Sequence, residues 1–138
     1  MQTDLGRDMA ITIIEVPVIS EAIRRLGAPV SALVRVGGLL LTCGMPPIDH
    51  RTGAIVSGDI EAQARAAIDA LSFTLTFAGS SLAQVAKSTI FITEATLMPA
   101  MNDVYKTYFP HGYPARSLVA VKPWTAPFDL EIECIAEA

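Results

Sequence analysis

Hydrophobic and polar positions along the chain follow a helical spacing in one long segment. Between residues 60 and 78, apolar residues recur at intervals of four and three, which places them on one helix face. Asp59 is positioned to cap the start of this helix, and Gly79 is positioned to end it. The pattern therefore predicts an amphipathic helix lying on a sheet.

Two further helices are indicated by their boundary residues. Residues 99–109 begin with a proline and are followed by Pro110, as is typical of a helix that starts and stops at these points. A shorter helix is predicted over residues 20–26, with Ser20 as its N-cap and Gly27 as its stop.

Runs of apolar and β-branched residues predict six strands. The Gly37–Gly38 pair can supply the positive φ angles of a tight turn, so we expect the strands on either side of it to form a hairpin. The last two strands are predicted to form a second hairpin about the loop 123–127. The predicted strands span residues 11–16, 32–36, 39–43, 85–93, 115–121 and 128–136.

The order of these elements indicates the fold class. Strands are followed by a helix, a strand, a helix and two strands, which predicts an α+β fold with a mixed β-sheet and two helices packed on one face. A chain of 138 residues is of the size of a single domain, so we expect one domain over residues 1–138.

The composition suggests self-association. Charged residues make up 17% of the chain and hydrophobic residues 51%, whereas roughly 25% charged is typical. We therefore expect part of the surface to be covered by other copies of the chain. A net charge of -4 argues against a nucleic-acid partner, because such proteins are usually basic.

The distribution of apolar residues argues against a membrane protein. No apolar run approaches the roughly 20 residues that span a bilayer, and Asp4, Arg7 and Asp8 interrupt the first residues, unlike a secretion signal. We expect a cytoplasmic location.

Cysteines and histidines do not form a metal-binding pattern. Cys43 and Cys134 are far apart in the sequence, and His50 and His111 have no ligand partner at helical or turn spacing. Free thiols and the absence of a metal site are therefore predicted.

One arginine and two glutamates are the candidates for chemistry. Because side chains alternate along a strand, the predicted second hairpin places Arg116 on the same face as Glu131 and Glu133, and nearly opposite Glu133. A guanidinium binds a carboxylate through two parallel hydrogen bonds. This pattern fits either an ion pair on a solvated sheet face or a small-molecule site.

Several short strings resemble, in the same order, those of the RidA (YjgF-like) family of enamine and imine deaminases. The resemblance covers roughly residues 28–136. It implies a chorismate-mutase-like α+β fold and a homotrimer with ligand clefts at the subunit boundaries. The strings are Thr42-Cys43-Gly44, Gln63-Ala64-Arg65-Ala66-Ala67-Ile68, Lys87-Ser88-Thr89-Ile90-Phe91, Asn102-Asp103-Val104-Tyr105-Lys106-Thr107-Tyr108-Phe109, Pro114-Ala115-Arg116-Ser117 and Glu131-Ile132-Glu133-Cys134-Ile135-Ala136.

The resemblance implies roles for four residues. Arg116 matches the arginine that binds the substrate carboxylate, and Glu131 matches the glutamate that holds or activates water. Gly44 corresponds to a glycine whose main chain contacts the ligand, and Cys43 stands where a serine is common. The implied reaction is hydrolysis of 2-imino or enamino acids to 2-oxo acids and ammonia. An imine is already electrophilic, so we expect no metal or other cofactor.

The chain departs from the family pattern at two positions of the cleft. Val30 replaces a common tyrosine, and Leu118 replaces a cysteine. A more apolar cleft is expected, with a preference for bulkier or more hydrophobic substrates. Residues 1–27 form a longer N-terminal section with no assigned role, and Trp124 is either a lid or an interface anchor.

Two other functions stay open at this point. One is deamination of an amino-dienoate of the aminomuconate type, and the other is a regulatory or ligand-binding trimer without turnover, which the changes at Val30 and Leu118 allow. Cys43 is interpreted as a thiol that lines the cleft, because no histidine is placed to activate it.

Overall fold

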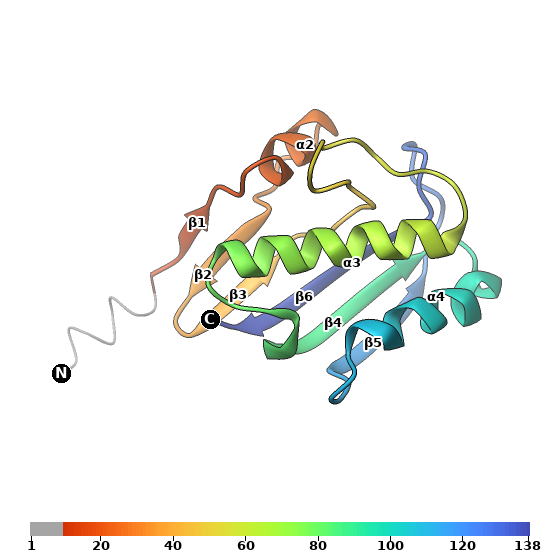
Figure 1. The fold of residues 1–138 in the computed structure, drawn as a ribbon. Helices are drawn as coiled ribbons and strands as arrows, with labels where there is room; N and C mark the ends of the chain where they lie inside the picture. Colours follow the sequence, from red (N-terminus) through yellow and green to blue (C-terminus); the bar gives the residue numbers. More distant parts are fainter. Residues whose placement is uncertain (1–9) are drawn as a thin grey trace.

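A six-stranded mixed sheet forms the centre of the protein, with the strand order β1-β2-β3-β6-β4-β5 (Figure 1). The computed structural model describes residues 10–138, so Asp4, Arg7 and Asp8 lie outside the described part. β4 and β5 are parallel, and the other neighbouring strands are antiparallel. The strands are β1 (Thr12–Ile14), β2 (Leu33–Val36), β3 (Leu39–Thr42), β4 (Val85–Ile92), β5 (Ala115–Ala120) and β6 (Leu130–Glu137).

Helices α3 (Ile60–Phe77) and α4 (Met98–Tyr105) cover one face of this sheet (Figure 1). The Asp59 carboxylate accepts a hydrogen bond of 2.8 Å from the Ala62 N–H, and Gly79 follows the helix with φ +88. Both predicted boundaries of the long helix are therefore confirmed. The described residues also form three short 3-10 helices, at Leu82–Gln84, Ala95–Leu97 and Lys106–Tyr108.

The N-cap of helix α2 (Ile19–Arg25) lies two residues earlier than predicted, so Ser20 is inside the helix. Val18 occupies that position, while the buried Ser20 hydroxyl accepts a hydrogen bond of 2.8 Å from the Val16 N–H. The serine satisfies an N–H before the helix instead of one inside it. The predicted stop is confirmed, since Gly27 has φ +83.

The hairpin about Gly37 is confirmed, with β2 and β3 antiparallel and Gly37 at φ 55. The second predicted hairpin is wrong. β5 is an edge strand that pairs with β4 alone, whereas β6 lies between β3 and β4. The connection between β5 and β6, residues 121–129, is long enough to cross β4. Hairpin turns usually have only about two to five residues.

This sheet order separates Arg116 from the two glutamates. Arg116 pairs in register with Ser88, whose buried hydroxyl lies 2.7 Å from the Tyr105 hydroxyl of α4, so Arg116 is on the helix-covered face. Glu131 and Glu133 pair with Phe91 and Thr89, which are on the other, open face. The prediction that all three charged side chains share a face is wrong.

The described part of the N-terminal section is integrated into the fold. β1 pairs with β2 at the sheet edge, and α2 buries Ile19, Ala22 and Ile23 in the core. Among residues 10–138, no helix has the length and apolar composition needed to cross a membrane.

Candidate active site

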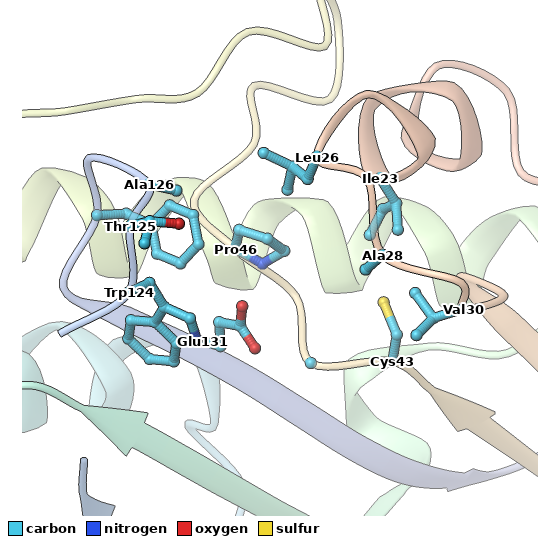
Figure 2. Close-up of a pocket in the computed structure, with 12 residues that line it drawn as sticks. Ile23, Leu26, Ala28, Val30, Cys43, Pro46, Trp124, Thr125, Ala126 and Glu131 are labelled. Atoms are coloured by element: carbon cyan, nitrogen blue, oxygen red, sulfur yellow. The ribbon is translucent and has the colours of Figure 1, made fainter. Parts of the chain in front are cut away.

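A pocket of about 250 Å³ opens between α2, the segment after β3 and the loop before β6 (Figure 2). Figure 2 shows the Glu131 carboxylate pointing into this space, with Trp124 on one side and Cys43 on the other. Most of the wall is apolar. The apolar wall is formed mainly by Ile23, Leu26, Val30, Pro46, Trp124 and Phe128.

A β-bulge brings the main chain of residues 42–44 to this pocket. Leu41 pairs with Ile135 and Met45 with Ile132, so three residues of the first segment lie opposite two of β6. The Thr42 hydroxyl compensates for the interrupted ladder by accepting a hydrogen bond of 3.0 Å from the Cys134 N–H. The bulge thereby places Cys43 and Gly44 beside Glu131.

Gly44 leaves room for the Glu131 carboxylate. A Cβ atom at this position would lie 2.5 Å from Oε1 of Glu131, while the backbone does not have the positive φ that favours glycine. Among residues 10–138, the Gly44 N–H donates no hydrogen bond. It is available as a donor to a ligand.

The Glu131 carboxyl is suited to proton transfer. Burial, and secondly the nearby Glu133 carboxylate, raise the pKa of Glu131 to about 7. Within the described residues it takes part in no ion pair, and no hydrogen bond contributes to its pKa. A carboxyl with this pKa can accept or donate a proton near neutral pH.

Cys43 is a poor nucleophile in this setting. Burial, followed by the Glu131 charge, raises the pKa of the Cys43 thiol to about 12. The thiolate form, which is the reactive one, is therefore scarce at neutral pH. This supports the interpretation of Cys43 as a lining residue.

Arg116 lies in a second pocket, of about 330 Å³, with Asn102, Tyr105 and Tyr113. Its guanidinium is 4.8 Å from the centroid of the Tyr105 ring, a cation–π contact, and it forms no ion pair with an acid in the described part of the chain. Oδ1 of Asn102 is buried without a hydrogen-bond partner. Within one copy the guanidinium is thus not paired with Glu133, and it can bind a carboxylate.

The predicted site residues consequently fall into two groups. Val30, Cys43, Gly44 and Glu131 come together in the first pocket, and Arg116 lies in the second. Leu118 pairs with Ile90 and packs against the core, outside the lining of both pockets.

Sequence reasoning missed the contribution of α2 and of Asn102. Ile23 and Leu26 line the first pocket, and the spacing of Ile19, Ala22, Ile23 and Leu26 already has the three- and four-residue intervals of a helix face. For Asn102 no such periodic signal exists. Trp124, whose role was open, lines the first pocket, with its ring centroid 5.2 Å from that of Phe128.

Known proteins share both sequence and fold with this chain. Residues 21–138 match the family described as Endoribonuclease L-PSP. A RutC family protein of Pyrococcus abyssi is 37% identical over 108 residues, which are 78% of this chain and 85% of the relative. The structure of YyfA from Yersinia pestis, a Rid family protein of unknown function, has a TM-score of 0.84 at 35% identity, covering 94% of this chain and 100% of that one.

TdcF of Escherichia coli is a relative with a suggested activity. It is named as a candidate reactive intermediate deaminase and is 35% identical over 106 residues, 75% of this chain and 81% of TdcF. Its structure with bound serine has a TM-score of 0.74 and covers 80% of this chain and 89% of that one, at 33% identity. On the family match and these relatives, the chain belongs to the Endoribonuclease L-PSP family, which comprises the YjgF, RidA and RutC proteins.

Proposed function

We propose that the protein hydrolyses reactive 2-imino and enamino acids to 2-oxo acids and ammonia. The observation that carries this proposal is a carboxyl of raised pKa, Glu131, in an apolar pocket beside the unpaired N–H of Gly44. The suggested deaminase activity of TdcF, and the amino acid bound to it, support a small substrate that carries a carboxylate.

The reaction needs orientation, water and one proton carrier. Water adds to the carbon of the C=N bond while ionised Glu131 takes one of its protons, and the Gly44 N–H can hydrogen-bond an oxygen of the substrate. Protonated Glu131 returns this proton to the nitrogen, which gives a carbinolamine with an O–H and an NH₂ group. Glu131 then takes the hydroxyl proton and passes it to the nitrogen, so that the C–N bond breaks, ammonia leaves and the C=O bond forms. Arg116 holds the carboxylate of the substrate.

A complete site, in this proposal, combines two copies of the chain. Arg116 and Glu131 of one copy are on opposite faces of its sheet, so they cannot bind the same small molecule. The open face also carries an apolar row, made of Ile13, Val34, Leu41 and Ile135, in which Ile13 is 68% exposed. We infer a homotrimer in which Arg116 of one copy reaches the Glu131 pocket of the next.

The cytoplasmic location expected from the sequence stays a prediction.

The experiment that tests this proposal mixes two inactive variants. An amino-acid oxidase generates the imine, and formation of the 2-oxo acid is followed with Arg116→Ala, with Glu131→Gln, and with both chains co-expressed. Each variant alone is expected to lose the rate enhancement. In random mixed rings about a quarter of the sites combine an intact arginine with an intact glutamate, so that share of activity should return.

Two results would contradict the proposal. Wild-type rates in either single variant would remove the assigned residue from catalysis, and no recovery in purified mixed oligomers would show that the two side chains do not meet across a subunit boundary. Ligand binding without any rate enhancement by the wild type would favour a regulatory role. RNA cleavage has less support, because the chain has a net charge of -4.

A further inference from the structure

We propose that the substrate carries an apolar side chain of the size found in leucine, methionine or phenylalanine, and that α2 and Trp124 select it. This inference rests on the proposed function and concerns the same pocket. The substrate class is defined here by the side chain attached to the reacting C=N carbon.

The pocket offers few charged groups to a substrate side chain. Glu131 is the one charged side chain among the described residues of a single copy that line it, and the nearby Cys43 thiol is neutral. In the proposed trimer, Arg116 of the next copy is already engaged by the substrate carboxylate. In the proposed reaction Glu131 contacts the water and the reacting carbon. A charged side chain of the substrate would therefore lose its hydration in the pocket without gaining an ion-pair partner. An apolar side chain would instead remove Trp124, Leu26 and itself from water.

The pocket is also large compared with a small substrate side chain. At about 250 Å³, it exceeds what the methyl group of an alanine-derived imine can fill. Space that the ligand leaves empty gives up van der Waals contacts with the walls. Branched or aromatic side chains would make those contacts with Val30, Pro46 and Trp124.

The residues proposed to select the side chain come from α2 and the segment that follows it. Ile23 lies on α2 and Leu26 at its C-terminal end, and Val30 stands where many family members have a tyrosine. Leu26 is 40% exposed, so part of its side chain is free to contact a ligand, while the buried Ile23 anchors α2 to the core.

The first measurement compares imines generated by an oxidase from alanine, leucine, methionine and phenylalanine. The kcat/KM value for the larger apolar imines should exceed that for the alanine imine by about tenfold or more. Trp124→Ala should reduce this ratio to about twofold, mainly by lowering the values for the larger substrates. Phe77→Ala is the matched control, since Phe77 is a 50% exposed aromatic residue of α3 outside both pockets.

A second measurement tests the side-chain preference by ligand binding, without turnover. Trp124 is the single tryptophan of the chain, so its fluorescence can report the binding of 2-oxo acids directly. We expect 4-methyl-2-oxopentanoate to bind about tenfold more tightly than pyruvate, and Leu26→Ala to reduce that difference. Equal affinities would overturn the inference even if every imine is deaminated. If affinity follows side-chain size but no imine reacts faster than in buffer, the proposed function fails and the preference stands.

Discussion

At the scale of single residues, the site depends on how closely a carboxylate can approach the main chain. Glu131 occupies the space that a side chain at position 44 would need. The motif Thr42-Cys43-Gly44 pointed to this glycine through resemblance. The physical reason for it is visible only when the bulge and β6 are placed next to each other.

Gly44→Ala is therefore expected to reduce activity without unfolding the protein. The new Cβ would lie 2.5 Å from Oε1 of Glu131, and that atom is the end of a flexible side chain that can move away. The stability should change by less than about 1 kcal/mol, whereas kcat/KM should fall by at least about tenfold because the carboxyl is displaced. Imine hydrolysis and urea unfolding measure the two effects.

Gly38→Ala serves as the matched control for this change. A Cβ atom added at Gly38 would meet no other side chain or backbone of the described residues within 4 Å, and this glycine has no positive φ. The activity of the Gly38→Ala protein should equal that of the wild type. An active Gly44→Ala protein would mean that the contact with Glu131 is unimportant for turnover.

The pH dependence of the reaction should report the titration of Glu131. Burial raises the pKa of this carboxyl to about 7, so the ionised form, which accepts the proton from water, is lost as the pH falls below that value. The kcat/KM value should thus rise from pH 5.5 to pH 8.5, with a midpoint near 7. Glu133→Gln removes a nearby negative charge and should move the midpoint to lower pH. A midpoint that is the same in both proteins would speak against Glu131 as the titrating group.

At the scale of elements, boundaries set by local chemistry could be predicted, whereas pairing partners could not. Asp59 and Gly79 mark the ends of α3 because capping involves only a few neighbouring residues. The position of β6 between β3 and β4 depends instead on contacts with residues far away in the sequence. The alternation along β6 correctly indicated its open face, but the same reasoning failed for Arg116 because β5 was paired with the wrong strand.

Gln63 ties the start of α3 to the loop that carries Trp124. This glutamine is 2% exposed, and its amide donates to the Gly58 carbonyl and to Oδ2 of Asp129, both at 3.0 Å. Its own oxygen accepts a hydrogen bond of 2.7 Å from the Asp129 N–H. One buried side chain thereby holds the loop ahead of β6 against the helix.

Gln63→Ala should destabilise the protein by about 2 to 3 kcal/mol, because it leaves buried polar groups without partners. It should also change the fluorescence of Trp124, which lies in the loop that Gln63 holds. Urea unfolding and emission spectra give both readouts. Gln84→Ala is the comparison, since the Gln84 amide has an exposed, longer bond of 3.4 Å to Glu137. Similar losses of stability in the two variants would show that the buried hydrogen bonds of Gln63 contribute no more than an exposed one.

At the scale of the whole molecule, the division of the site between two pockets matches the composition of the chain. A chain with 17% charged residues and an uncovered apolar sheet face favours association, and association is what the proposed site requires. Composition predicts that copies assemble, and this stays a prediction. It could not indicate that Arg116 and Glu131 face opposite ways, because this follows from the order of the strands.

The position of β6 also determines how the sheet can be completed during folding. β1, β2 and β3 form one group of paired strands, β4 and β5 form another, and β6 joins them although it follows both in the sequence. Until it arrives, β3 and β4 each present an open edge to which any other extended chain could bind. The strand that carries Glu131, the carboxyl proposed to transfer the proton, is thus also the strand that joins the two groups, so Glu131 reaches its place in the pocket only when β3 and β4 are both paired with β6.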